Sequence, residues 1–311
     1  MTLAIGDGAN DVNMILQAHV GVGIAGKEGQ QAARSADYSI GEFKSLKPLM
    51  FIHGREAYRR NAMLVAYAFY KNILYVVPQY YFGFNSAFSG QPLYESFIYQ
   101  LYNITMTSLP IMFYALFDWE YLKPEFMSKP KLYHIGMNNE CWSNTIFVKW
   151  LFYALIHGFL LYFFCIISVV GERQYESDGK EIGFWIAGHT VYGGAVFVAN
   201  LVILHQFNNF TGYGEALVAL MCLAFFVFLG LESSLGYAMG QGAGKFADVN
   251  HIARHMFSMF TIWAAFVLMC GSVSAGELCM RAWKKVIGRL NESDQRGSYA
   301  AFVDEDHPKS I

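Results

Sequence analysis

The spacing of hydrophobic and polar residues changes near residue 60 and divides the chain into two unlike parts. In the first part, short apolar runs at residues 2–5, 20–24 and 38–40 alternate with segments of helical spacing. Such alternation is typical of an α/β layer with parallel strands. Three short strands cannot bury a core alone, so this part is expected to be the end of a larger domain.

Six apolar stretches follow, each near the roughly 20 residues that a helix needs to cross a bilayer. They cover residues 63–82, 97–117, 150–170, 185–205, 216–236 and 256–275. The fifth is the weakest, because Glu232 lies near its end. The third carries no formal charge and is longer than most buried helices of soluble proteins need to be, which favours membrane spans over core helices. The pattern predicts an all-α bundle of six transmembrane helices.

Composition agrees with a membrane protein, because 55% of the 311 residues are hydrophobic, 15% are charged and the mean hydropathy is +0.28. The 22 basic and 24 acidic residues nearly balance, so charge gives no reason to expect a nucleic-acid partner. The five cysteines lack CxxC spacing, which favours packing roles over a metal cluster or disulfides. No signal-peptide pattern opens the chain, so internal spans are expected to insert it.

Basic residues gather in alternate loops, and this bias predicts the orientation of the spans. One side holds Arg55, Arg59, Arg60, Lys123, Lys129, Lys131, Lys149, Arg281, Lys284, Lys285 and Arg289, and the other holds Arg173, Lys180, Lys245 and Arg254. With six spans, the positive-inside rule places both termini in the cytoplasm. The glycosylation sequon at Asn209 then falls in a cytoplasmic loop and is expected to stay unmodified.

The first predicted strand runs into a turn that carries two carboxylates, Asp7 and Asp11. In open α/β sheets, ligands gather beyond the carboxyl ends of the strands, where helix N-termini present free N–H groups. Carboxylates there suit Mg²⁺ accompanied by a substrate phosphate. Gly6 and Gly8 permit a close turn, and Asn10 offers an amide to a phosphoryl oxygen. On spacing alone, an ordinary turn with Asp11 as an N-terminal helix acid remains an alternative.

A glycine pattern just downstream suggests a different ligand. Gly21, Gly23 and Gly26 fit the G-x-G-x-x-G spacing of dinucleotide sites. The run before them is short for a strand and Gly29 interrupts the helix that should follow, so this reading is disfavoured.

Lys71 lies midway along the first apolar stretch, where a charged side chain costs roughly 2.5–3.5 kcal/mol on insertion scales. A polar partner or cavity is therefore expected. Asn72 is adjacent, and the second stretch carries Asn103, Thr105, Thr107 and Ser108 before Pro110. A polar cavity lined by these groups and interhelical hydrogen bonds for packing are both open readings.

Neither of the first two stretches contains Asp or Glu, which disfavours a calcium or sodium pump, because Ca²⁺ takes six to eight oxygen ligands, usually including carboxylates. His157 and His189 lie in separate apolar stretches and are expected to be packed, hydrogen-bonded residues rather than metal ligands.

Several motifs resemble one family. GDGANDVNMI (6–15), VGVGIAGKEGQQAARSADYSI (20–40) and FIHGREAYRRN (51–61) are similar to the hinge end of the phosphorylation domain of P-type ATPases, specifically the phospholipid-flippase (type IV) subfamily. FYKN (69–72), FSGQPLYE (88–95) and LYNITMTSLP (101–110) extend the resemblance. It covers about residues 1–275, closely over the first 120.

The resemblance implies a mixed fold, with a short haloacid-dehalogenase-like α/β remnant followed by the six-helix bundle. It implies that Asp7 and Asp11 bind Mg²⁺, that Asn10 and Asp11 contact nucleotide or phosphate, and that ATP is the co-substrate. It further implies that Lys71, Asn72 and Asn103 lie near the route of a phospholipid head group. The implied setting is a eukaryotic plasma membrane or endomembrane, and a two-helix accessory subunit is a possible partner.

The expected organisation is a phosphorylation-domain remnant at residues 1–54, a membrane domain at 55–278 and a cytoplasmic tail at 279–311, with a short helix followed by disorder. The chain lacks the Asp-Lys-Thr-Gly-Thr phosphorylation loop, the Asp-Gly-Glu actuator loop, a nucleotide-binding domain and four further helices. It is therefore expected to be an incomplete C-terminal part that cannot turn over ATP alone. Two other functions remain open, a haloacid-dehalogenase-like phosphatase anchored by helices and a noncatalytic six-helix channel or scaffold.

Overall fold

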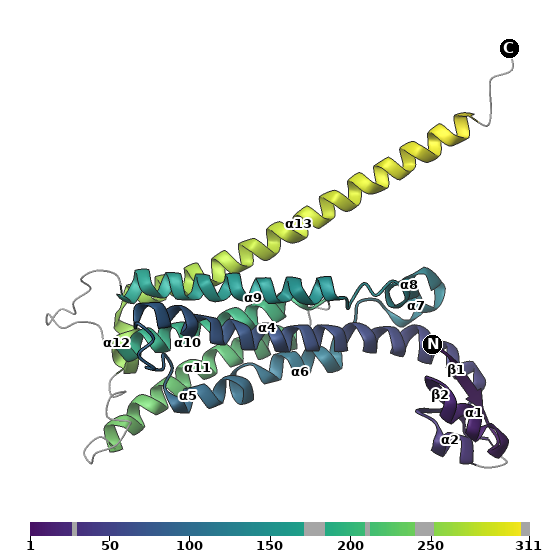
Figure 1. Cartoon of the computed structure of the whole chain (residues 1–311), viewed down its shortest axis with the longest axis horizontal. Helices are drawn as coiled ribbons and strands as arrows, with labels where there is room; N and C mark the ends of the chain where they lie inside the picture. Colours follow the sequence, from purple (N-terminus) through teal and green to yellow (C-terminus); the bar gives the residue numbers. More distant parts are fainter. Residues whose placement is uncertain (27–29, 171–183, 209–211, 240–251, 306–311) are drawn as a thin grey trace. The chain divides into compact units, whose positions relative to one another are not determined.

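The computed structural model describes residues 1–26, 30–170, 184–208, 212–239 and 252–305. It forms two compact units, which we call unit 1 (Met1–Val65 and Phe117–Phe147) and unit 2 (Ala66–Leu116 and Val148–Ile311). Helix α4 (Arg55–Asn85) contributes its first turns to unit 1 and the rest to unit 2 (Figure 1). The sequon at residues 209–211 lies outside the described residues.

Unit 1 contains the predicted parallel sheet. Strands β1 (Leu3–Gly6), β2 (Val20–Ile24) and β3 (Tyr38–Ile40) pair in that order, both pairs parallel. Helices α1 (Val12–Gln17) and α2 (Gln31–Ser35) make the two crossovers that parallel pairing requires. All three strands lie where the apolar runs predicted them, within one residue.

The glycines of the G-x-G-x-x-G pattern serve packing in this sheet. Gly21 and Gly23 lie inside β2 instead of following it, as a dinucleotide site would require. A Cβ atom on Gly23 would come within 2.5 Å of both the carbonyl oxygen of Ala32 and the Cα atom of Ala33. Gly23 therefore makes room for α2 to lie against the strand, and the structure gives the dinucleotide reading no support.

The rest of unit 1 joins the start of α4 to the segment 117–147. After β3 come η2 (Phe43–Ser45), α3 (Leu46–Pro48) and the π-helical η3 (Leu49–Gly54), and residues 117–147 hold α7 (Lys123–Ser128), η5 (Pro130–Tyr133) and α8 (His134–Met137). The Phe51 and Tyr133 rings lie 5.1 Å apart, and the Arg55 guanidinium lies 4.9 Å from the centre of the Phe126 ring. Aromatic contacts thus hold this segment against η3 and the start of α4.

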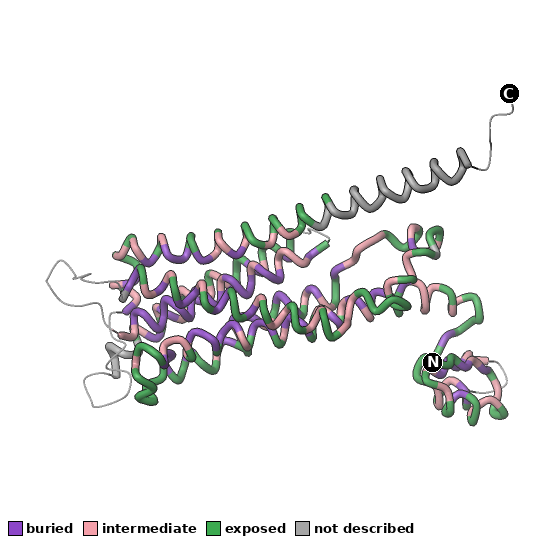
Figure 2. Tube along the Cα trace, turned by 45° about the horizontal axis from the view of Figure 1, so that its top comes forward, coloured by how far each residue is buried: buried purple, intermediate pink, exposed green. Residues whose placement is uncertain are grey.

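Unit 2 is a bundle of helices (Figure 1). Its later part comprises α9 (Asn144–Cys165), η6 (Ile166–Val170), α10 (Phe184–Gln206), α11 (Gly212–Met239), α12 (Ile252–Ser258) and α13 (Phe260–Glu305). Within the described residues, four helical segments are long and apolar enough to cross a membrane, namely Asn144–Val169, Phe184–Gln206, Gly212–Ser234 and Phe260–Trp283. In α10, 89% of the apolar stretch is buried, against 44% in α9 and 28% in both α11 and α13, so α10 is the most buried of these four helices (Figure 2).

The first two predicted spans take a different form. Helix α4 is continuous through Pro78, but Lys71, Asn72 and Gln79 reduce its apolar character. The second stretch is divided into α5 (Ser96–Leu101), the π-helical η4 (Tyr102–Met106) and α6 (Ser108–Phe117). Neither belongs to the four membrane-crossing segments among the described residues, so six spans remain a prediction.

The C-terminal region differs from the prediction in two details. The sixth stretch, expected at approximately residues 256–275, begins at Phe260, because residues 256–258 belong to α12. The Trp263 indole N–H donates to the Phe257 carbonyl (3.3 Å) and so satisfies a group that the end of α12 leaves free. A short helix followed by disorder was expected after Glu277, but α13 continues to Glu305, since no proline interrupts it.

Candidate functional site

The structure brings Asp7 and Asp11 together in one turn at the carboxyl end of β1. Asp11 ends the short 3-10 helix η1 (Ala9–Asp11), and its side chain turns back toward the strand. The Asp11 Oδ2 atom accepts the backbone N–H groups of Asp7 and Gly8, both at 3.2 Å. Asp7 and Asn10 are exposed, whereas Asp11 is half-buried. The turn therefore presents one free carboxylate beside another that holds the loop in shape.

Gly6 makes this turn possible. A Cβ atom at position 6 would collide with the Asp11 side chain. Gly8 is less constrained, because the nearest atom to a Cβ there would be Asp11 Oδ2 at 3.8 Å. Gly6 is thus required for the close approach of Asp11, whereas Gly8 leaves space in front of the turn.

The donor chemistry of this turn fits Mg²⁺. Mg²⁺ in proteins is held by one or two carboxylates together with water and substrate phosphate, rather than by a cage of protein ligands alone. Asp7 and Asp11 supply two carboxylates, and no group of three or more His, Cys, Asp or Glu side chains suited to a metal occurs among the described residues. The turn could therefore hold a magnesium ion only with solvent and phosphate completing its coordination.

Replacing Asp11 by alanine is expected to loosen the turn. The N–H groups of Asp7 and Gly8 would lose their acceptor, which lowers the free energy of opening the turn by about 1 kcal/mol. Hydrogen exchange at these two amides should therefore be about fivefold faster. Hydrogen-exchange mass spectrometry with residue-level fragmentation measures this. Asn13→Ala, an exposed change in the next turn, is the control and should leave both amides unchanged. Equal exchange in the Asp11→Ala and wild-type chains would contradict the assigned role of this carboxylate.

Lys71 has the polar partner that its position in an apolar helix predicts. Its side chain is 8% exposed, and its Nζ atom donates to Thr107 Oγ1 (2.9 Å). The Thr107 hydroxyl donates to the Tyr102 carbonyl (2.8 Å), and the Tyr102 hydroxyl donates to the Lys71 carbonyl (3.0 Å). These three hydrogen bonds close a ring between α4 and η4, which we call the lysine ring (Lys71, Tyr102 and Thr107).

Side chains satisfy backbone carbonyls at the break between η4 and α6, and one of these carbonyls belongs to the lysine ring. Pro110 has no N–H group, so it cannot bond to the carbonyl of Met106 four residues earlier. The Asn200 side-chain amide, from α10, donates to that carbonyl instead (2.9 Å). The carbonyl of Tyr102 accepts the Thr107 hydroxyl in the same way. Irregular backbone at membrane depth is tolerated where side chains satisfy it, and π-helical turns occur frequently at functional sites.

The predicted neighbours of Lys71 do not join the lysine ring. Asn72 is exposed and donates to the Ala68 carbonyl of its own helix (2.9 Å), and Asn103 is also exposed. Thr107 was predicted among the polar groups of the second stretch, whereas Tyr102 and Asn200 were not predicted. Both are fully buried polar side chains, and the one sequence signal near them is Pro110 within the second stretch.

The histidines are hydrogen-bonded, as expected. His157 Nδ1 lies 2.6 Å from the Tyr70 hydroxyl. His189 lies 2.7 Å from the Trp185 carbonyl through Nδ1 and 3.1 Å from Glu232 Oε2 through Nε2.

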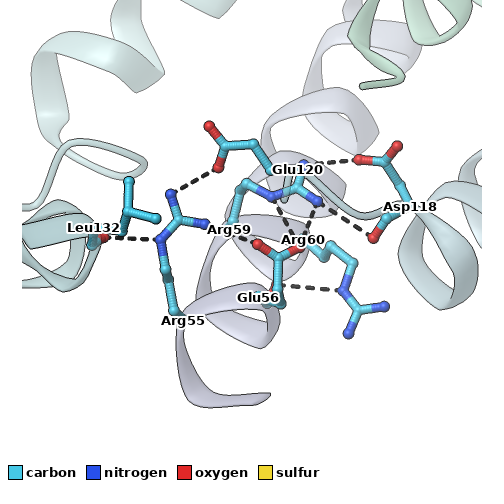
Figure 3. Close-up of polar contacts among 7 residues, drawn as sticks. All are labelled: Arg55, Glu56, Arg59, Arg60, Asp118, Glu120 and Leu132. Carbon is cyan, nitrogen blue, oxygen red and sulfur yellow. Dashed lines mark hydrogen bonds and ion pairs between the residues drawn. The ribbon is translucent and has the colours of Figure 1, made fainter. Parts of the chain in front are cut away.

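Unit 1 also contains a buried cluster of charges that was not predicted, formed by Arg55, Glu56, Arg59, Arg60, Asp118 and Glu120, which we call the charge cluster (Figure 3). Glu56 is fully buried, and its two oxygens accept from Arg55 (2.8 Å) and Arg59 (2.7 Å). Arg59 also pairs with Asp118 (2.8 Å), and Arg55 with Glu120 (2.7 Å). The Arg55 Nε–H group donates to the Leu132 carbonyl, and that of Arg60 to the Glu56 carbonyl. The charge cluster thus joins the first turns of α4 to segment 117–147.

These features define a helical multi-pass membrane protein that carries a small parallel α/β unit on the same chain. Residues 33–289 match the family described as phospholipid-translocating P-type ATPase C-terminal. The chain therefore belongs to the phospholipid-translocating P-type ATPase family, whose C-terminal region it matches.

Individual relatives agree with this assignment. The chain is 41% identical to human phospholipid-transporting ATPase IG over 234 residues, which are 73% of this chain and 20% of the relative. It is 35% identical to phospholipid-transporting ATPase C887.12 of Schizosaccharomyces pombe over 269 residues, 86% of this chain and 21% of the relative. It is also 35% identical to phospholipid-transporting ATPase DNF1 of Saccharomyces cerevisiae over 275 residues, 87% of this chain and 17% of the relative. The chain thus spans about a fifth of the length of these relatives.

Proposed function

We propose that this chain is the C-terminal part of an ATP-driven phospholipid translocase, which moves lipid toward the cytoplasmic leaflet through an aspartyl-phosphate cycle. The observation that carries the proposal is the lysine ring. Among the described residues, the Lys71 ammonium is held by a neutral hydroxyl, and no carboxylate forms an ion pair with it. An uncompensated positive charge suits an anionic phosphate group and repels a metal cation.

The lipid route of this proposal uses Lys71, Asn72 and Asn103. The two asparagines lie on exposed surface of unit 2, where their amides are open to a head group, whereas the Lys71 ammonium lies inward. A phospholipid head group needs hydrogen bonds and modest charge, which amides and one ammonium supply. All three of these residues lie in α4 and in the broken α5–η4–α6 segment. The proposal therefore counts these two segments as spans in addition to the four longer apolar helices, which makes six spans with both termini in the cytoplasm.

In this proposal, the turn after β1 binds the magnesium ion and the phosphate of ATP. Asp7 and Asp11 would hold Mg²⁺, and Asn10 and Asp11 would contact the phosphate or nucleotide of ATP. When bound, the metal orients and neutralises the phosphoryl group. Asp11 holds the turn through the N–H groups of Asp7 and Gly8, while the exposed Asn10 amide can donate to a phosphoryl oxygen. The proposed boundaries are residues 1–54 for this remnant, 55–278 for the membrane domain and 279–311 for the tail.

The test is lipid transport by the full-length gene product in proteoliposomes, with and without a co-expressed two-helix accessory subunit. We expect ATP-dependent transfer of a fluorescent phospholipid between leaflets, a phosphoenzyme that forms with ATP, and loss of both in Asp7→Asn. Lys149→Met, an exposed change at the start of α9, is the control and should transport normally. Hydrolysis of phosphate esters without lipid movement would show an anchored phosphatase instead, and absence of any phosphoenzyme would show a noncatalytic membrane protein.

A further inference from the structure

Three buried ionisable side chains of unit 2 have no part in the proposed transport mechanism and interact with one another, His189 with Glu232 and Glu232 with Glu95. His189 on α10 is 1% exposed, Glu232 on α11 is 2% exposed, and Glu95 immediately before α5 is 8% exposed. Burying charged groups is costly unless they are paired or change protonation. We call these residues the acidic triad (Glu95, His189 and Glu232).

The hydrogen bonds of His189 require a proton between it and Glu232. The Nδ1 atom lies 2.7 Å from the Trp185 carbonyl, and because a carbonyl only accepts, Nδ1 carries hydrogen. The Nε2 atom lies 3.1 Å from Glu232 Oε2. A bare ring nitrogen facing a carboxylate would place two acceptors in contact. One proton must therefore lie in this contact, carried by the imidazole or by the carboxyl group.

With a single proton, the acidic triad keeps a net negative charge and one carboxyl oxygen without a hydrogen-bond partner among the described residues. With one proton in the His189–Glu232 contact and Glu95 ionised, the three groups carry a net charge of −1 in a buried space. The second oxygen of Glu232, Oε1, is buried and has no hydrogen-bond partner among the described residues. No lysine or arginine of the described chain forms an ion pair with either carboxyl group. A second proton would neutralise the charge and give Oε1 a hydrogen.

The surroundings of Glu95 agree with proton uptake. Its Oε2 atom accepts the N–H groups of Phe97 (2.5 Å) and Ile98 (3.2 Å), so it caps the N-terminus of α5. Burial raises the pKa of the Glu95 carboxyl, these two backbone N–H groups lower it, and the neighbouring charge of Glu232 raises it further; the net shift is upward.

The other ionisable groups around the acidic triad are weak acids or lie at its margin. Tyr75 of α4 interacts electrostatically with Glu95, and Tyr192 of α10 with Glu232. Cys165 of α9 donates to the carbonyl of Ala187, two residues before His189. Helix α12, which packs against α10 and α11, carries the exposed Arg254 and the half-buried His255.

We propose that the acidic triad is a proton-binding site inside the helical bundle, which holds one proton at neutral pH and takes up a second when the pH falls. The ligand is the proton itself, and the second proton is shared between the Glu95 and Glu232 carboxyl groups. Its uptake weakens Glu95 as an acceptor and so loosens the N-terminus of α5. The site thereby links proton binding to the broken segment that supplies Thr107. This inference does not depend on lipid transport.

Infrared difference spectroscopy on the 311-residue chain in lipid nanodiscs tests the proposal, with a titration from about pH 8 to about pH 5, above the ordinary range for glutamic acid. We expect a protonated-carboxyl band to appear at a higher pH than that of exposed glutamates. Glu95→Gln and Glu232→Gln should each remove this band. Glu215→Gln, an exposed change in the first turn of α11, is the matched control and should keep it.

The titration of the wild-type chain tests the proposal even if a variant fails to fold. Absence of any protonated-carboxyl band above the ordinary range would overturn the proposal. Persistence of the band in folded Glu95→Gln and folded Glu232→Gln would overturn it as well. Isotope-labelled histidine locates the first proton, and a His189 ring that is neutral while Glu232 is ionised at neutral pH would contradict the shared contact.

Discussion

Replacing Glu56 by glutamine is expected to destabilise unit 1 by about 3–5 kcal/mol, the usual cost of removing one partner from a buried ion pair. Glu56 is fully buried and accepts from both Arg55 and Arg59. Glutamine has nearly the same shape but no charge, so the two guanidinium groups would lose the carboxylate that they share, while the ion pairs with Asp118 and Glu120 remain. Segment 117–147 should then separate more easily from the first turns of α4.

Cys141 provides a local measurement of this opening. It lies within segment 117–147 and is half-buried, and burial raises the pKa of its thiol despite the nearby Arg55 guanidinium. Thiol labelling at increasing urea concentrations, followed by mass spectrometry of each peptide, should show Cys141 exposed at much lower urea in Glu56→Gln. The exposed Cys279 is an internal reference for the labelling reaction.

Glu125→Gln is the matched control, because it makes the same chemical change in an exposed pair of the same unit. The Glu125 carboxylate lies 3.6 Å from the Lys129 ammonium, and the two side chains are 43% and 60% exposed. Exposed pairs contribute about 0–1 kcal/mol, so Cys141 labelling should hardly change. If Glu56→Gln and Glu125→Gln behaved alike, the charge cluster would not be what holds segment 117–147.

Features that depend on neighbouring residues could be predicted from the sequence. The three strands follow from short apolar runs, and their parallel pairing follows from the helices between them. Asp7 and Asp11 share one turn because they are four residues apart. The magnesium role of that turn stays a prediction, because carboxylates at the end of a strand can hold a loop, bind a metal or do both.

Features that depend on distant residues could not be predicted in the same way. Arg55 and Arg59 indicated only the cytoplasmic side of a membrane, since nothing local shows that Asp118 and Glu120 fold against them. Glu232 looked like a defect in a membrane span, although its partner His189 had been noticed separately. The break after Met106 was equally hidden, because Pro110 marks a missing hydrogen bond but not the Asn200 amide that replaces it.

Among the residues of the proposed lipid route, Lys71 is the one that carries a charge. The substitution Lys71→Met is expected to remove the contribution of this ammonium group to the proposed transport. In the full-length protein, lipid-stimulated ATP hydrolysis should fall in kcat/KM by about tenfold to a hundredfold, the loss of one hydrogen bond from a charged group, worth about 1.5–3 kcal/mol. Methionine fills a similar volume without a charge. Hydrolysis should be measured against phospholipid concentration, with Lys149→Met as the control.

A stability measurement on the same variants separates transport from folding. A buried ammonium is costly in a bilayer, so Lys71→Met should be at least as stable to heat as the wild-type chain. Thr107→Val keeps the ammonium but removes its hydroxyl partner, and should be less stable. If the lysine ring served only to stabilise the fold, both variants would be unstable. The molecules that still fold would then hydrolyse ATP with the same dependence on phospholipid concentration as the wild-type protein. A stable Lys71→Met protein that has lost lipid stimulation can be explained only by an ammonium group that is retained, against its energetic cost, for the lipid.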